Sequence, residues 1–189
     1  MDVVIVGDGP GGLSAALFLA KNGLSTVVYG QDKTAMHWAL VRNYLGVNEI
    51  HGSEFQKLAR QQVGRFGALL QDRHVAAVAR NSSGNDSGND SGFTVTLEGG
   101  EQVSARYVIL SEGKSPKLAQ ELGASFDGQR VVTDKNNLTS VPGVYAVGRS
   151  ARPGRSQAII SAGDGAVAAL DIISREKGQD FADWDSPPK

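Results

Sequence analysis

The first part of the chain reads as a strand, a helix and a second strand. An apolar run over 2–6 is followed by glycines and then by a helical pattern over 11–22. Gly23 stands where a glycine commonly ends a helix. A second apolar run over 26–30 predicts the next strand, and the unit is typical of a parallel sheet that begins at the N-terminus.

The middle of the chain predicts one helix and a set of short strands. Residues 31–51 show no clear period, so we expect a long functional loop with at most a short helix. A helix is predicted over 52–66, with Ser53 as its N-cap. Strands follow it, and the last two form a hairpin around Gly99-Gly100. The predicted strands cover 68–71, 73–80, 93–98 and 101–105.

The last part of the chain returns to the parallel pattern. A strand over 106–110 is apolar to its end, which favours a central place in the sheet. Residues 112–128 predict a loop with a short helix. Pro142-Gly143 predicts a turn into a strand over 144–147, and a final helix is predicted over 157–177. The fold class is therefore α/β, with a Rossmann-like parallel sheet in three layers and a small antiparallel β-meander.

Two segments fall outside this pattern. Residues 81–92 (NSSGNDSGNDSG) have no apolar side chain, so we expect a disordered hairpin tip. Their spacing does not fit an EF-hand calcium loop. Residues 179–189 form a polar tail in which Phe181 and Trp184 are the expected anchors. We expect a single domain over 1–178.

Composition narrows the function classes. The net charge of −1 favours neither nucleic acid nor an anionic membrane as a partner. The sequence shows no apolar run of membrane-spanning length and no signal-peptide pattern, so we expect a cytoplasmic protein. It contains no cysteine, which excludes a CxxC pair, a catalytic thiolate and disulfides. The widely spaced His37, His51 and His74 show no metal-ligand pattern, so no metal site is expected.

The glycines after the first strand form a dinucleotide-binding motif. Gly7, Gly9 and Gly12 fit G-x-G-x-x-G between a strand and a helix. The first glycine permits a tight turn, the second lets the backbone approach a pyrophosphate, and the third lets the helix lie close to the strand. The N-terminus of that helix offers N–H groups to the phosphates. The motif alone permits either FAD or NAD(P).

Three further segments accompany this motif in order along the chain. They are 42–46 (RNYLG), 107–113 (YVILSEG) and the pair 139–148 and 156–165. Together with Gly7–Gly12, they resemble the FAD domain of thioredoxin reductases in the pyridine-nucleotide disulfide oxidoreductase superfamily. The corresponding family motifs are E-N-[WF]-P-G, a strand ending in A-T-G, and T-x-x-P-G-[VI]-[FY]-A-x-G-D followed by R-Q-x-x-x-[SA]-A-G-x-G.

The resemblance implies non-covalent FAD. The family's last helix begins against the pyrimidine edge of the flavin, where backbone N–H groups stabilise negative charge on the reduced ring. Asn43, Tyr44, His37 and Trp38 are candidates to line the flavin face, and no side chain stands out as a catalytic acid or base. The predicted cofactor contacts are Gly7, Gly9, Pro10, Gly12, Tyr29, Gly30, Gln31, Asp32, Asn43, His74, Val75, Ser111, Glu112, Gly113, Gly148, Arg149, Gln157, Ala158 and Ile159.

The chain departs from the family where the second domain should be. The family inserts a nicotinamide-binding domain that carries the CxxC after its A-T-G segment. Here only about 25 residues separate Gly113 from Thr139, and no second G-x-G-x-x-G occurs. The sequence therefore predicts no built-in NADPH site and no reduction of thioredoxin by the family's mechanism.

Three single positions also depart from the family. Arg149 replaces an Asp and could pair with the phosphates or point to solvent. Glu112 replaces the Thr of A-T-G. The acid expected after the second strand to hold the ribose is absent, because Tyr29-Gly30 occupies that place. Asp32 or Gln31, just beyond, could substitute for it.

Three functions remain open at this point. The first is an FAD oxidoreductase that exchanges electrons with free NAD(P)H or an electron-transfer protein. The second is a non-catalytic FAD-binding or degenerate structural or regulatory relative. The third is an NAD(P)-binding domain, against which the 139–165 segment argues. The resemblance also implies a homodimer.

Overall fold

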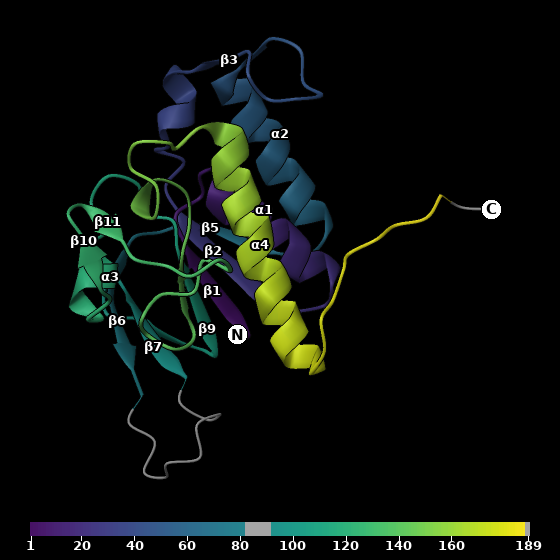
Figure 1. Ribbon diagram of the computed structural model, residues 1–189. Coiled ribbons are helices and arrows are strands. Elements are labelled where there is room, and N and C mark those ends of the chain that lie inside the picture. The colour runs from purple at the N-terminus through teal and green to yellow at the C-terminus, as the bar shows by residue number, and fades with distance from the viewer. Residues whose placement is uncertain (82–91, 188–189) are drawn as a thin grey trace.

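A five-stranded parallel sheet forms the middle layer of the computed structural model, which describes residues 1–81 and 92–187 (Figure 1). The order of its strands is β12-β9-β1-β2-β5. The five strands are β1 (Val3–Val6), β2 (Thr26–Gly30), β5 (Leu69–Asp72), β9 (Tyr107–Leu110) and β12 (Val144–Ala146).

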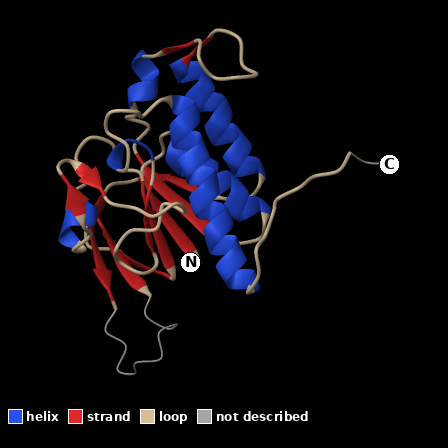
Figure 2. Cartoon of the chain, viewed as in Figure 1, coloured by secondary structure: helices blue, strands red, loops and turns tan. Residues whose placement is uncertain are grey.

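Helices cover one face of this sheet and an antiparallel meander covers the other (Figure 2). The helices are α1 (Pro10–Lys21), α2 (Gly52–Arg65) and α4 (Ala158–Lys177). The meander consists of β6 (Val75–Arg80), β7 (Phe93–Leu97) and β8 (Gln102–Ala105). The predicted three-layer fold with a small antiparallel meander is confirmed.

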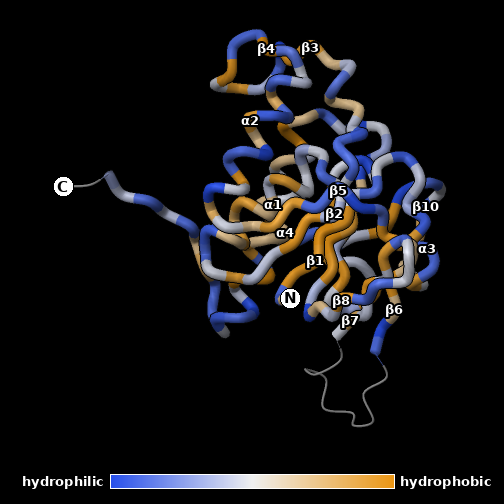
Figure 3. Tube along the Cα trace, turned by 180° about the vertical axis from the view of Figure 1, so that it is seen from behind, coloured by the Kyte–Doolittle hydropathy of each residue, from blue (hydrophilic) through white to orange (hydrophobic). Residues whose placement is uncertain are grey.

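Alternating side chains of β1 explain the three layers. Val3 and Ile5 pack among the helices, whereas Val4 packs with the meander residues Phe93 and Val95. Both faces of the strand are buried, so its sequence is apolar throughout. The parallel strands are accordingly among the most hydrophobic parts of the chain (Figure 3). β9 lies between β12 and β1, which confirms its predicted central place.

Helices α1 and α4 approach each other through glycines. A Cβ atom on Gly165 would overlap the carbonyl oxygen of Gly11 and lie 2.9 Å from its carbonyl carbon. Gly165 therefore allows the two helix backbones to touch. Because Gly11 lies in the first turn of α1 and Gly165 in the N-terminal half of α4, this contact fixes the start of α1 against α4.

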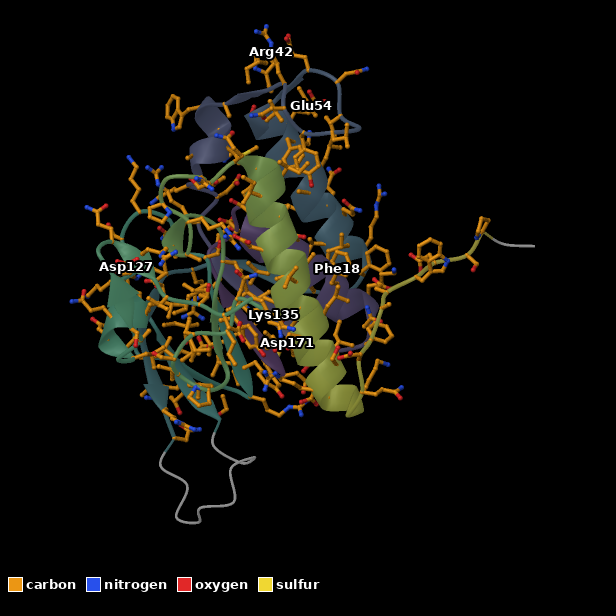
Figure 4. All side chains as sticks on the ribbon, viewed as in Figure 1. Phe18, Arg42, Glu54, Asp127, Lys135 and Asp171 are labelled. Atoms are coloured by element: carbon orange, nitrogen blue, oxygen red, sulfur yellow. The ribbon has the colours of Figure 1, made fainter. Side chains whose placement is uncertain are left out.

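A polar cluster attaches α4 to the last strand. The buried Tyr145 of β12 donates its hydroxyl proton to Asp171 of α4 at 2.6 Å. Figure 4 labels the Asp171 side chain on this helix. The same carboxylate accepts hydrogen bonds from Asn136 at 2.8 Å and from Arg175 at 2.7 Å. Burial and the neighbouring carboxylate raise the pKa of the Tyr145 hydroxyl. The cluster therefore satisfies a buried hydroxyl that would otherwise be costly.

The connections contain short elements. The predicted loop over 31–51 includes η1 (Ala35–Trp38) and the pair β3 (Leu40–Val41) and β4 (Ile50–His51). The connection from β9 to β12 holds α3 (Lys117–Glu121), β10 (Phe126–Asp127) and β11 (Arg130–Val131). A short turn, η2 (Gly148–Ser150), follows β12. Within the described residues, no helix is both long and apolar enough to cross a membrane.

Two details differ from the sequence predictions. α2 begins at Gly52 with His51 as N-cap, so Ser53 lies inside the helix. The Gly52 amide donates to the carbonyl of Ala39 at 2.9 Å, which fixes the helix start by tertiary contact. Trp184 is 86% exposed and anchors nothing, whereas Phe181 packs beside α4.

The predicted hairpin tip is described only at its two ends. Residues 82–91 lie outside the described residues, so the prediction of disorder there stays a prediction. At the ends, the Asn81 amide donates to the carbonyl of Gly92 at 2.9 Å.

Candidate functional site

A cavity of about 960 Å³ opens at the carboxyl ends of the parallel strands. Val6, Tyr29 and Leu110 are register partners at those ends, so the turns after β1, β2 and β9 lie side by side. This edge of an open α/β sheet is where ligands commonly bind. The cavity extends from the glycine turn to the start of α4 and to the first residues of β6.

The cavity collects most of the predicted cofactor contacts. Those that line it are Gly7, Gly9, Pro10, Tyr29, Gly30, Gln31, Asn43, His74, Val75, Ser111, Glu112, Gly113, Gly148, Arg149, Gln157 and Ala158. They come from every segment that carries the family resemblance. Their contact with a cofactor stays a prediction.

Three predicted contacts do not line the cavity. Gly12 lies beneath the turn, where a Cβ atom would overlap the carbonyl oxygen of Gly7; it serves the close packing of helix on strand. The Asp32 carboxylate turns toward His37, whose Nε2 lies 3.0 Å from Oδ1. Ile159 is partly exposed on the outer side of the first turn of α4.

The four candidates for the flavin face separate into two groups. Asn43 and Trp38 line the cavity, and Trp38 is 92% exposed. Tyr44 instead packs on the ring of Phe55 at 5.3 Å between centroids, and His37 lies beside Asp32. Only the first pair is placed to touch a ligand in the cavity.

A hydrogen bond joins two distant segments across the cavity mouth. Asn43 Nδ2 donates to Gln157 Oε1 at 3.0 Å, across 114 positions of sequence. Both residues belong to segments that carry the family resemblance. This contact shows that the segments form one site.

The glycine turn is held by its neighbours. Gly7 has a φ of +99°, which favours glycine, and its amide donates to the carbonyl of Tyr29 at 2.7 Å. A Cβ atom at Gly7 would overlap the carbonyl oxygen of Ser111. The turn therefore brings the ends of all three central strands together at the floor of the cavity.

Two helices begin at this cavity without side-chain caps. Gly9 and Gln157, the N-caps of α1 and α4, both line the cavity and supply no capping hydrogen bond. The first amides of a helix have no partner inside the helix, and its N-terminus attracts anions. The two ends can thus stabilise negative charge at two places in the cavity.

Basic side chains exceed acidic ones around the cavity. The basic residues that line it are Lys33, Arg73, Lys114, Lys117 and Arg149, and the acidic ones are Asp8 and Glu112. Among the described residues, Lys114 and Arg149 have no ion-pair partner, whereas Arg73 pairs with Glu101 at 2.5 Å. The cavity is therefore suited to an anionic ligand.

Sequence reasoning missed several of these residues. It passed over Asp8, Lys33, Lys114, Lys117 and Arg73, which all line the cavity. Asp8 is the one residue of this group that the neighbouring sequence could have indicated, because it lies inside the glycine motif and an acid is unusual beside a phosphate site. The lysines and Arg73 are placed by turns whose positions no local pattern predicts.

Glu112 has a role that its place in the family motif did not indicate. Its two carboxylate oxygens accept the amides of Leu118 at 2.8 Å and Ala119 at 3.2 Å, at the start of α3. Burial raises the pKa of the Glu112 carboxyl above its ordinary value of 4.5, against these hydrogen bonds. Glu112 therefore caps the short helix in the β9–β12 connection.

The raised pKa of Glu112 gives a test by pH. The pKa of the Glu112 carboxyl is higher in the folded state than in the unfolded state. Its contribution to stability is therefore fully present below the unfolded-state pKa and is lost as the pH rises through the folded-state pKa. Glu112→Gln, which cannot ionise, should therefore gain stability relative to wild type between pH 4 and pH 7, as measured by urea unfolding. At pH 7, Glu112→Ala should cost about 1 kcal/mol through loss of the cap. A Glu112→Gln variant whose free energy of unfolding falls relative to wild type as the pH rises would contradict this account.

The arrangement fits a dinucleotide that carries a flavin. Gly7 and Gly9, which have no Cβ atom, lead into the uncapped start of α1, and this suits a pyrophosphate. The uncapped start of α4 lines the same cavity together with Asn43, so that a polar ring edge can be bound there. Among the described residues, no group of three or more potential metal ligands is present.

Comparison with known proteins agrees with this geometry. The family described as "Pyridine nucleotide-disulphide oxidoreductase" matches residues 1–82 and 51–165. A thioredoxin reductase of Helicobacter pylori is 31% identical over 133 residues, which cover 66% of this chain and 39% of that protein. The chain thus spans about two fifths of the length of this curated relative.

Solved structures share the fold at lower identity. An atypical thioredoxin reductase from Desulfovibrio vulgaris Hildenborough has a TM-score of 0.82 at 21% identity, covering 94% of this chain and 98% of its own. A ferredoxin-flavin thioredoxin reductase from Clostridium acetobutylicum has a TM-score of 0.76 at 17% identity, with coverage of 94% and 97%. At these identities the likeness concerns the fold alone.

The match over most of the chain, the order of the strands and the converging segments lead to one assignment. The chain belongs to the pyridine nucleotide-disulphide oxidoreductase family, and its fold is that of the family's FAD-binding domain.

Proposed function

We propose that this chain binds FAD non-covalently and works, as a homodimer, in electron transfer with an external donor. The donor is free NAD(P)H or an electron-transfer protein, and the reaction is not the reduction of a disulfide. The observation that carries the proposal is the cavity in which Asn43 and Gln157 meet beside two uncapped helix N-termini.

Different residues of the cavity bind different parts of FAD. The glycine turn and the first amides of α1 bind the pyrophosphate, with Arg149 and Lys114 as its counter-charges. Asn43 and Gln157 orient the ring edge, and the first amides of α4 stabilise negative charge there. Once bound, the flavin supplies the hydride or electron transfer.

Three observations support the external donor. The sequence has no cysteine, so it offers no dithiol to a disulfide. The β9–β12 connection holds one five-residue helix and a two-stranded hairpin, which leaves no room for a second nucleotide-binding unit. The Clostridium relative is named for both ferredoxin and flavin, which favours a protein donor as one of the two classes.

Exposed apolar side chains support the homodimer. Ile159, Ile160 and Val167 of α4 are each more than a third exposed. A row of this kind on one helix suits contact with a second copy.

The test is the colour of the purified protein. Two absorbance bands between about 350 and 550 nm, with FAD released on denaturation, are expected. Anaerobic NADH, NADPH or a reduced electron-transfer protein should then bleach the bands. A coloured protein that no donor reduces would instead favour the non-catalytic FAD-binding alternative. A colourless protein that takes up no added FAD would overturn the proposal.

A further inference from the structure

The acid expected at the end of β2 is absent, and the side chain of another residue occupies its place. Gly30 lines the cavity at the position where this fold commonly holds an acid for the ribose. A Cβ atom on Gly30 would overlap Cγ of Asp8 and lie 2.5 Å from its Oδ1. The carboxylate of Asp8 thus occupies the space into which a residue-30 side chain would extend.

The two substitutes that the sequence offered do not reach this space. The Asp32 carboxylate faces His37 and does not line the cavity. Gln31 is exposed and accepts from Lys33 Nζ at 3.3 Å. Gln31 also lines the cavity, but Asp8 is only 4% exposed and its carboxylate fills the space over Gly30.

The Asp8 carboxylate is held in a fixed direction. Its Oδ2 accepts from a guanidinium nitrogen of Arg60 and from the Asp32 amide at 3.0 Å. Gln56 Nε2 donates to the Asp8 carbonyl at 2.6 Å, which fixes the backbone as well. Arg60 is itself held by Asp72 Oδ1 at 2.6 Å. Two elements, α2 and β5, therefore position one carboxylate.

This arrangement leaves Oδ1 available. The hydrogen bonds from Arg60 and from the Asp32 amide both end on Oδ2, and Oδ1 lies over Gly30 at the cavity. A carboxylate oxygen that faces a cavity is a strong acceptor for a hydroxyl group of a ligand. A ribose offers two neighbouring hydroxyls, and the end of β2 is where the ribose of an adenine dinucleotide lies.

We propose that Asp8, from within the glycine turn, accepts a hydrogen bond from a ribose hydroxyl of the adenosine half of the cofactor and so replaces the absent acid of β2. The inference rests on the proposed binding of FAD. It also explains why position 30 is glycine, since any larger residue would displace the Asp8 carboxylate.

Nucleotide competition tests the proposal on the unmodified protein. ADP, 2′-deoxy-ADP and 3′-deoxy-ADP are compared for their ability to displace FAD, followed by flavin fluorescence. ADP should compete about tenfold better than at least one deoxy analogue. Equal competition by all three would overturn the proposal. If FAD itself does not bind, the proposed function fails instead, and the two failures are distinct.

Variants locate the contact. Asp8→Asn, which keeps the shape of the side chain, should weaken FAD binding about 10- to 100-fold. It should also reduce the gap between ADP and the deoxy analogue to about twofold or less. Far-UV circular dichroism and a thermal melt establish that the variant is folded. Asp32→Asn is the comparison, and weakened FAD binding there but not in Asp8→Asn would overturn the proposal.

Moving the acid back to β2 is the strictest test. Gly30→Asp alone should lose FAD, because its Cβ atom collides with the Asp8 carboxylate. With Asp8→Ala beside it, the space is free and the acid stands at the strand end, so FAD affinity should return to within about tenfold of wild type. A double variant weaker than both single variants would contradict the exchange of roles.

Discussion

The Gly7→Ala variant is expected to lose FAD binding and about 2 to 5 kcal/mol of folding free energy. Alanine is strained at a φ of +99°, and its Cβ atom would overlap the carbonyl oxygen of Ser111. Neither backbone segment can move alone, because the Gly7 amide donates a hydrogen bond to the Tyr29 carbonyl and the Ser111 amide donates one to the Val6 carbonyl. Urea unfolding and FAD titration measure the two losses.

The Gly9→Ala variant is expected to weaken FAD binding without destabilising the fold. Gly9 has an ordinary φ of −71°, and its Cβ atom would meet only Thr34 Oγ1, at 3.5 Å. The protein without FAD should therefore melt within about 2 °C of wild type, while the new methyl group at the cavity weakens FAD binding tenfold or more. Gly154→Ala, where a Cβ atom meets nothing within 4 Å, is the neutral control. Equal damage from Gly7→Ala and Gly154→Ala would refute this account.

The Gly165→Ala variant is expected to cost about 3 kcal/mol of folding free energy and to lower Tm by about 6 to 12 °C. The added Cβ atom would overlap the Gly11 carbonyl oxygen and lie 3.0 Å from the Ala15 amide nitrogen. All of these are backbone atoms of α1, so no side chain can rotate away. The helices must separate, and differential scanning calorimetry measures the result.

Gly163→Ala is the matched control in the same helix. A Cβ atom on Gly163 meets nothing within 4 Å. Since alanine favours a helix over glycine, this variant should gain about 0.5 to 1 kcal/mol. A loss of similar size in both variants would mean that helix propensity, not the contact with Gly11, decides the outcome.

The sequence was most informative where the determinants are local. The glycine motif, the apolar strands and the hairpin at Gly99-Gly100 depend on neighbours within a few positions, and each lies where it was predicted. The central place of β9 followed from its unbroken apolar run, since only a strand buried on both faces needs one.

The site residues missed by sequence reasoning depend on distant partners. Asp8 is oriented by Arg60, 52 positions away, and its target space exists only because Gly30 has no side chain. The role of Glu112 depends on where α3 begins. The N-cap of α2 was assigned wrongly to Ser53 for the same reason, because a contact of the Gly52 amide with Ala39 and not a capping serine fixes the helix start.

β9 and β12 pair directly with each other, although a long connection separates them in sequence. The two strands are parallel, with Leu110 opposite Ala146, so the connection leaves the carboxyl end of β9 and returns to the amino end of β12, where the Val108 amide donates to the carbonyl of Gly143. Surface connections between paired strands tolerate large insertions. The family resemblance implies that a nicotinamide-binding domain is inserted at this connection in the larger relatives. The connection is thus a point at which evolution or a protein engineer can exchange a whole domain for a short helix while β9 and β12 keep their pairing.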